Sequence, residues 1–137
     1  MAGARGPAAA QASIQLPHAP SSARAARRFV AATLRGWRLD GVSQVVELLA
    51  GELVTNAITH TPASSVGIGL VVTLGGDAVR VEVHDTSPQL PKHEGMGGWD
   101  DEAGRGLELV AALATRWGSD IDGHSAGKAV WFEVHTA

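Results

Sequence analysis

The chain has 137 residues, with 11 Lys and Arg against 14 Asp and Glu, so its formal net charge at pH 7 is −3. A chain of this length is expected to form one compact domain, and its overall charge does not attract nucleic acid or anionic membranes. The absence of cysteine excludes disulfides, thiolate metal sites and cysteine nucleophiles. No apolar run resembles a signal peptide or a membrane span, and we expect a cytoplasmic protein.

The N-terminal region is expected to contribute a tail and an edge strand. Residues 1–12 are rich in Ala and have little to bury, so we expect a flexible tail followed by a domain over residues 13–137. Residues 13–16 alternate polar and apolar side chains and stop at Pro17, which is typical of a short edge strand.

A helix is predicted from Ser21 or Ser22 to about residue 37. Its apolar stripe consists of Ala26, Phe29, Val30, Thr33, Leu34 and Trp37. The opposite face is basic and carries Arg24, Arg27, Arg28, Arg35 and Arg38. This basic face is either simply solvated or a docking surface for an acidic partner.

A second helix is predicted over residues 43–60, ending before Pro62. At about 100° per residue, Glu52 and Asn56 fall close to Val45 on the core-facing half of this helix. A carboxylate there is costly unless it is paired or lines a wet site. Glu52 therefore either pairs with an arginine inside the fold or serves a ligand.

A β-hairpin and a long loop are predicted next. Residues 66–74 and 79–84 alternate apolar and polar side chains around a Gly75-Gly76-Asp77 turn. Beyond Asp85 the periodicity ends, and residues 86–103 are rich in Gly and Pro. A loop of this length in a compact domain is usually functional.

The remaining elements complete the predicted fold. A third helix is expected to begin at Gly104 and to run through Trp117, with Leu107, Val110, Ala111, Ala114 and Trp117 on its apolar stripe. A final hairpin is expected over residues 119–122 and 128–135. Because strands and helices do not alternate as βαβ units, we expect an α+β fold with a mixed, mostly antiparallel sheet and three helices on one face.

Motifs for other chemistries fit this context poorly. Gly123 to Gly127 matches the G-x-S-x-G nucleophile elbow around Ser125, but a strand follows where that motif needs a helix. A hydrolase acting through Ser125 would lose its activity in Ser125→Ala. The six histidines show no zinc-ligand spacing.

The surviving residues indicate a nucleotide site. An amide oxygen such as that of Asn56 suits Mg²⁺, which takes few protein ligands beside phosphate oxygens. The Asp85 carboxylate can accept a hydrogen bond from the exocyclic amine of a base such as adenine. A helix start containing Gly104 and Gly106 lets backbone amides approach phosphate.

Three ordered segments resemble the nucleotide-binding boxes of the GHKL (histidine-kinase-like) ATPase superfamily. They are Glu52-Leu53-Val54-Thr55-Asn56-Ala57 with His60, Asp85-Thr86-Ser87-Pro88, and Gly104-Arg105-Gly106-Leu107. The resemblance is closest to small bacterial proteins related to anti-sigma-factor serine/threonine kinases. It implies a two-layer α/β sandwich of the Bergerat type that binds ATP between its helices and its sheet.

The resemblance also implies a role for each matching residue. Glu52 would orient or deprotonate the attacking hydroxyl, Asn56 would bind Mg²⁺, and Asp85 would hold adenine. Residues 86–103 would form a lid hinged at the glycines. The implied nucleotide contacts are Asn56, His60, Asp85, Ser87, Gly104, Arg105, Gly106 and Leu107. Arg27 lies where the resembling kinases use an arginine in partner contact, and we group it with Arg24 and Arg28.

The chain departs from the resembling pattern at three places. Ser87 and Gln89 stand where the first box has glycines, and Lys128-Ala129 stands where a threonine often contributes a hydroxyl. Asp100-Asp101-Glu102 places acids just before the third box, where they would repel a triphosphate.

Two functions follow from the resemblance. One is a regulator that binds a sigma factor and phosphorylates its antagonist protein, and the alternative is an ATP-binding module without phosphoryl transfer. Self-association through the N-terminal strand is also implied.

Overall fold

The computed structural model describes residues 9–60, 67–85, 101–121 and 128–136. Within them, three helices and five strands follow one another in the order β1 (Ala10–Leu16), α1 (Ser22–Gly36), α2 (Asp40–His60), β2 (Ile68–Gly75), β3 (Ala78–Asp85), α3 (Asp101–Leu113), β4 (Arg116–Ile121) and β5 (Lys128–His135). None of the helices in these ranges is long and apolar enough to cross a membrane.

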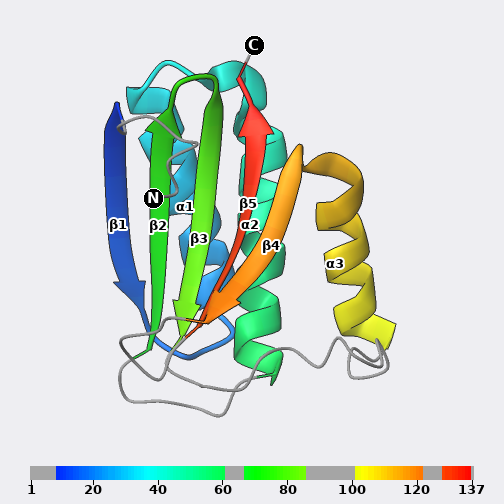
Figure 1. The fold of residues 1–137 in the computed structure, drawn as a ribbon. Coiled ribbons are helices and arrows are strands. Elements are labelled where there is room, and N and C mark those ends of the chain that lie inside the picture. The colour runs from blue at the N-terminus through cyan, green and yellow to red at the C-terminus, as the bar shows by residue number, and fades with distance from the viewer. Residues whose placement is uncertain (1–8, 61–66, 86–100, 122–127, 137) are drawn as a thin grey trace.

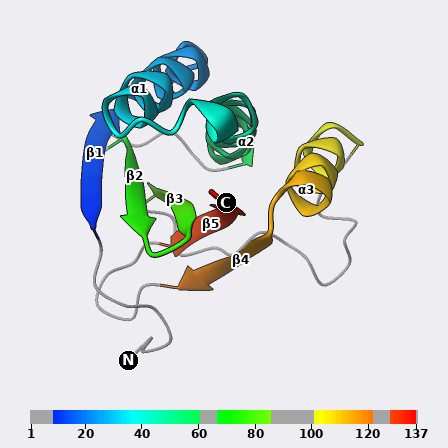
Figure 2. The same cartoon turned by 90° about the horizontal axis from the view of Figure 1, so that it is seen from above.

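The strands form one sheet in the order β1-β2-β3-β5-β4, with β1 and β4 at its edges. All four pairings between the described strands are antiparallel, so this sheet is antiparallel rather than mixed. Helices α1 and α2 cover one face, and α3 lies on the same side next to β4 (Figures 1 and 2). The predicted α+β fold with helices on one face is confirmed.

The core lies between the helices and the covered face of the sheet. Alternate residues of β3 point inward, namely Val79, Val81 and Val83, and each is almost fully buried. They are met by Ala26, Val30 and Leu34 of α1, by Val46, Leu49 and Leu53 of α2, and by Phe132 of β5. Burying one such aliphatic side chain contributes about 1.5–3 kcal/mol, so these predicted stripes fix the two layers.

A Schellman turn joins α1 to α2. Arg38 adopts a left-handed conformation with φ 62. The Leu39 amide donates to the Leu34 carbonyl at 2.9 Å, and the Arg38 amide donates to the Arg35 carbonyl at 3.0 Å. This pattern satisfies the last carbonyls of α1 and reverses the chain within a few residues. Helix α2 therefore starts at Asp40, three residues before the predicted start at residue 43.

Strand β1 is longer than predicted. It starts at Ala10 rather than at residue 13, because Ala10 already pairs with Leu74 near the far end of β2. Three residues that we assigned to the tail therefore belong to the sheet. The strand ends at Leu16, before Pro17, as predicted for an edge strand.

The junction between α3 and β4 differs from the prediction. Helix α3 starts at Asp101 rather than Gly104, so its first turn includes residues that were predicted to lie in the loop. It ends at Leu113, and Trp117 lies in β4 opposite Phe132 of β5. Of the predicted stripe, Leu107 and Val110 are buried but Ala111 is exposed. Trp117 packs against Leu107 across the junction.

Two glycines need their positive φ angles. Gly67 has φ +85, and a Cβ there would lie 2.3 Å from the Leu16 carbonyl oxygen, so β1 and β2 approach closely only with glycine at this position. Gly76, with φ +53, begins the two-residue turn of the predicted β2–β3 hairpin, where a Cβ would meet nothing within 4 Å.

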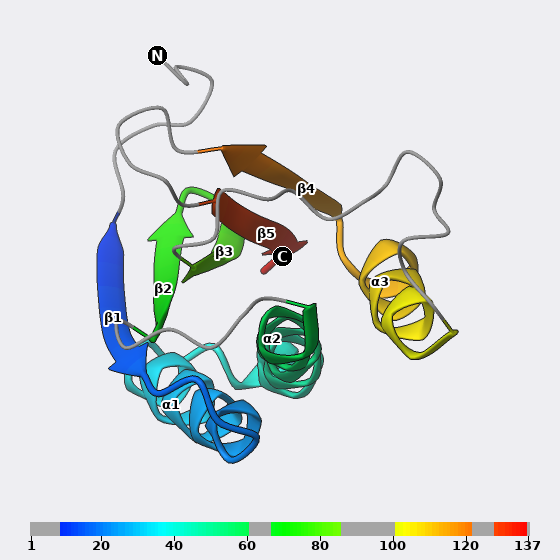
Figure 3. The same cartoon turned by 90° about the horizontal axis from the view of Figure 1, so that it is seen from below.

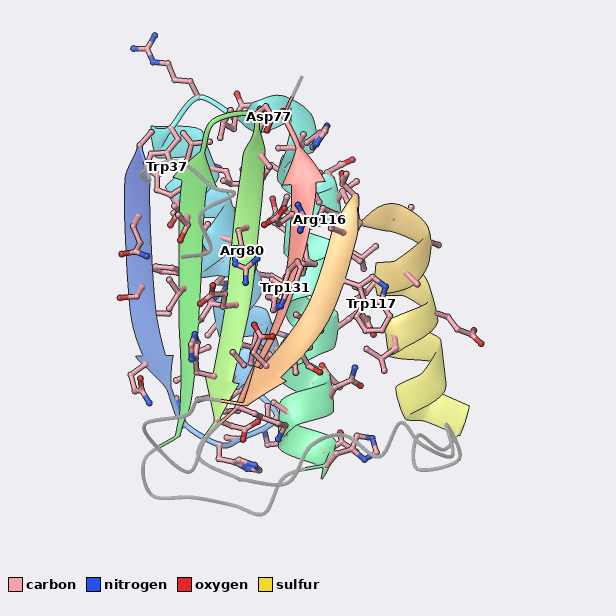
Figure 4. All side chains as sticks on the ribbon, in the orientation of Figure 1. Trp37, Asp77, Arg80, Arg116, Trp117 and Trp131 are labelled. Carbon is pink, nitrogen blue, oxygen red and sulfur yellow. The ribbon has the colours of Figure 1, made fainter. Side chains whose placement is uncertain are left out.

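The face of the sheet away from the helices carries a charged network around Trp131 (Figure 4). The Arg80 guanidinium lies 4.0 Å from the Trp131 ring centroid. Its Nη1 donates to Glu133 Oε2 at 2.9 Å and its Nε to Glu82 Oε2 at 2.7 Å. The hydrogen bond from His84 lowers the pKa of Glu82 from 4.5 to about 2; Arg80 also lowers it, while burial opposes both.

Candidate functional site

Several chain segments meet at one end of the molecule, which we call the site end. The C-terminal ends of α2 and β3 and the starts of α3 and β5 all lie there (Figure 1). The predicted sites on the second helix, at the end of β3 and at the third helix therefore come from neighbouring elements.

Helix α2 lies between α1 and α3, so its two flanks face different helices. Gly51 is buried against α1, because the Arg27 side chain lies where a Cβ of residue 51 would be. Glu52 and Asn56 are displaced from Gly51 by roughly 100° and 140° around the helix axis. Helices α1 and α3 lie on opposite sides of α2 (Figure 3), so Glu52 and Asn56 are on the flank away from α1.

The Glu52 side chain is half-buried. In the parts of the chain that the structure describes, no arginine or other group pairs with its carboxylate. The interpretation that an arginine within the fold neutralises Glu52 therefore gains no support there. A half-buried carboxylate without such a partner is suited to receive a proton or a hydrogen bond from a ligand.

Asn56, the only asparagine in the chain, is 9 % exposed. Its Nδ2 atom is fully buried and has no hydrogen-bond partner within the part of the chain that the structure describes. Leaving a buried donor unsatisfied costs about 1–3 kcal/mol. A ligand that accepts from Nδ2 and coordinates through Oδ1 would remove this cost.

Asp85 forms a buried ion pair that the sequence analysis did not predict. The Lys128 Nζ lies 3.1 Å from Asp85 Oδ1 and 3.0 Å from Oδ2, and each residue is 7 % exposed. The two residues are directly opposite in the β3–β5 register. The sequence predicts for Lys128 only that a family threonine hydroxyl is missing there. The signal that could have identified the pair is the position of Lys128 at the start of the last strand.

The other predicted nucleotide contacts are spread around the site end. His60 is exposed at the end of α2, and Leu107 is buried beside Trp117. Helix α3 begins at Asp101, so Gly104, Arg105 and Gly106 lie inside it. The backbone amides without a helical partner are those of the first turn, which starts at Asp101. Ser87 and most of the predicted lid lie outside the described residues.

The predicted basic face of α1 is present. Arg24, Arg27 and Arg28 are exposed, and the first turn of α1 contains no acidic residue. Arg27 also lies across Gly51 of α2, so its position depends on two helices.

The ligand requirements of Mg²⁺ can be compared with the side chains described at the site end. No group of three or more His, Asp or Glu that could hold a metal occurs among the described residues. Mg²⁺ is commonly held by one or two protein oxygens together with substrate phosphates. Asn56 would meet this requirement through Oδ1, and its Nδ2, which has no hydrogen-bond partner among the described residues, would donate to a phosphate oxygen.

Comparisons with known proteins agree with this fold. The family profile described as a histidine kinase-like ATPase domain matches residues 16–134, and the chain belongs to this family. An uncharacterized protein of Streptomyces coelicolor, SCO4941, is 36% identical over 73 residues, which cover 53% of this chain and 70% of that protein.

A solved structure shares the fold. The structure of the RsbU and RsbW domains of Rv1364c from Mycobacterium tuberculosis matches 92% of this chain with a TM-score of 0.63 and 22% sequence identity. The match covers 32% of that longer chain, so it concerns about a third of its length.

Proposed function

We propose that this protein binds ATP with Mg²⁺ at the site end and uses the nucleotide to regulate a protein partner. The observation that carries the proposal is the buried Asn56 amide, whose Nδ2 has no hydrogen-bond partner among residues 9–60, 67–85, 101–121 and 128–136. Membership of the histidine kinase-like ATPase family supports ATP as the ligand.

Each part of the nucleotide has a candidate residue. Asn56 would coordinate Mg²⁺ through Oδ1, and Asp85 would accept a hydrogen bond from the adenine amine. His60, Ser87, Gly104, Arg105, Gly106 and Leu107 remain predicted contacts. When bound, ATP would supply a transferable γ-phosphoryl group.

The proposed activity is that of a serine/threonine kinase acting on an anti-sigma antagonist protein. Glu52 would accept the proton of the attacking hydroxyl, and its half-buried carboxylate without a partner in the described chain supports this role. The fold shared with a structure that contains an RsbW domain is consistent with a place in a sigma-factor system.

Nucleotide binding is tested by calorimetric titration with Mg²⁺ and ATP. Wild type should bind ATP, Asn56→Ala should lose most of this affinity, and Thr55→Ala should retain it because Thr55 is exposed on the same helix. If wild type does not bind ATP, the proposed function is wrong.

Phosphoryl transfer is tested with labelled ATP and a purified antagonist protein. Glu52→Gln should bind ATP but transfer no phosphate. Glu47→Gln is the matched control, because Glu47 lies on the same helix and already accepts a hydrogen bond from Ser43. Equal turnover by Glu52→Gln and wild type would exclude Glu52 as the base.

The alternative function is an ATP-binding module without transfer. One observation favours it: the glycines predicted to open α3 lie within the helix. The same assay decides, because this alternative predicts bound ATP and an unmodified antagonist.

Partner binding is proposed for the basic face of α1. Changing Arg24, Arg27 and Arg28 to glutamate should weaken binding of the sigma factor while leaving ATP affinity intact. If partner binding is unchanged, the basic face of α1 is only solvated and does not bind the partner.

A further inference from the structure

Lys128 has donor capacity that the described chain does not use. A lysine ammonium carries three N–H donors. Within the described residues its only partner is the Asp85 carboxylate, which lies 3.0 Å and 3.1 Å away through its two oxygens. One carboxylate accepts at most two of the three donors in this arrangement. At least one N–H of a buried ammonium is therefore left without an acceptor there.

The pair is placed where a ligand would reach both groups. Asp85 continues the inward row of Val79, Val81 and Val83 along β3. Lys128 lies opposite Asp85 and on the same face of the sheet as Phe132. At the site end, the face of the sheet that the helices cover therefore carries a hydrogen-bond acceptor, the Asp85 carboxylate, next to a donor, the Lys128 ammonium.

We propose that Lys128 is a base-reading residue of the ATP site. While Asp85 accepts a hydrogen bond from the exocyclic amine of adenine, Lys128 donates its free N–H to the ring nitrogen beside that amine, N1 or N7. This inference rests on the proposed function, since it requires a bound adenine nucleotide. It adds a second point of recognition, because Asp85 alone reads only the amine.

The physical reason is the cost of an unpaired charged donor. A buried ion pair is favourable only when its remaining donors and acceptors are also satisfied. A ring nitrogen satisfies Lys128, whereas an analogue with a C–H in that place leaves the buried donor unpaired. Sites built to hydrogen-bond a ligand reject analogues that lack the matching group.

The test compares Mg²⁺ complexes of ATP, 1-deaza-ATP and 7-deaza-ATP by calorimetry on the wild-type protein. One of the two deaza analogues should bind about 10- to 100-fold more weakly than ATP, as expected for loss of a hydrogen bond to a charged group. Purine riboside triphosphate, which lacks the amine read by Asp85, should also bind more weakly.

The variant Lys128→Met separates base reading from a structural role. It should bind ATP and the discriminated deaza analogue with nearly equal affinity, while still binding purine riboside triphosphate less well than ATP. Arg116→Met removes the same charge from an exposed position on β4 and should keep the wild-type discrimination. Circular dichroism checks that both variants fold.

Each outcome has one meaning. If wild type binds ATP and both deaza analogues equally, or if Lys128→Met keeps the discrimination, the inference fails and the proposed ATP binding stands. If wild type does not bind ATP, the proposed function fails and the inference with it. The comparison on wild type needs no folded variant.

Discussion

The side chain of Arg27 occupies the space over Gly51 on the neighbouring helix. A Cβ at residue 51 would lie 2.5 Å from Arg27 Nη1 and 3.1 Å from its Cδ. The absence of a side chain at residue 51 thus lets an exposed arginine of α1 lie along α2. This contact links the proposed partner surface to the helix that carries Glu52 and Asn56.

Gly51→Ala is predicted to be energetically coupled to Arg27. Alanine in a helix interior is favoured over glycine by about 1 kcal/mol. When Arg27 is present, much of the stabilisation from Gly51→Ala is lost because the new methyl group displaces the Arg27 side chain. When Arg27 is replaced by alanine, Gly51→Ala gives its full stabilisation. Urea unfolding of the two single variants and the double variant should give a coupling of about 0.5–1 kcal/mol. Gly41→Ala, where a Cβ meets nothing, should show no coupling.

Asn56→Leu should separate stability from binding. Leucine has a similar size and no unsatisfied donor, so the ligand-free protein should gain about 1 kcal/mol. The same variant should lose affinity for Mg²⁺ and ATP. Thermal unfolding with and without nucleotide measures both effects, and a destabilised ligand-free variant would contradict the prediction.

Gly67→Ala should destabilise the protein by at least about 2 kcal/mol, because it combines an unfavourable positive φ with a clash against the Leu16 carbonyl. Gly76→Ala has the positive φ without the clash and should cost about 1 kcal/mol. Equal losses in chemical unfolding would show that the close approach of β1 to residue 67 carries no cost.

Arg38→Gly should stabilise the protein by about 0.5–1 kcal/mol, since glycine adopts the left-handed conformation at this helix end without strain. The same change at Arg35, in the last turn of α1, should destabilise by a similar amount. Unfolding midpoints of both variants test this contrast, and a loss of stability in Arg38→Gly would refute it.

Glu82 should make stability depend on acidity. Its pKa is about 2 in the folded protein, below the ordinary 4.5, so the unfolded chain takes up the proton first as the pH falls. The resulting stabilisation is complete above about pH 4.5 and is lost toward pH 2. The free energy of unfolding of wild type should therefore exceed that of Glu82→Gln by a margin that depends on pH. This margin should be larger at pH 6 than at pH 2 by up to about 3 kcal/mol. A difference that does not vary with pH would disprove this.

The sequence predicted those elements whose local pattern and tertiary packing agree. The alternation of Val79, Val81 and Val83 identifies β3 because one face of that strand is buried throughout. Trp117 misled the prediction, since its spacing from Leu107 and Val110 also fits a helix. Pairing with Phe132 of β5 decides its strand conformation, and no local pattern reveals that pairing.

The candidate site was predicted where it depends on local sequence spacing, and not where it depends on contacts between distant segments. Asn56 could be placed on an inward flank from helical spacing alone, and the structure shows it buried. The contact between Asp85 and Lys128 could not be predicted, because it depends on the register of two strands that are distant in sequence. The start of α3 at Asp101 could not be predicted, because Gly104 and Gly106 are poor helix formers and indicate a helix boundary instead.

The contact between Leu107 and Trp117 gives the protein a built-in optical reporter. Trp117 is a residue of β4 whose side chain packs against Leu107 of α3 (Figure 4), whereas Trp37 follows α1 and Trp131 lies on the uncovered face of the sheet. Indole emission shifts with the polarity around the ring. In a protein carrying Trp37→Phe, Trp99→Phe and Trp131→Phe, the fluorescence of Trp117 would follow any displacement of α3 from the sheet in real time, without an attached dye.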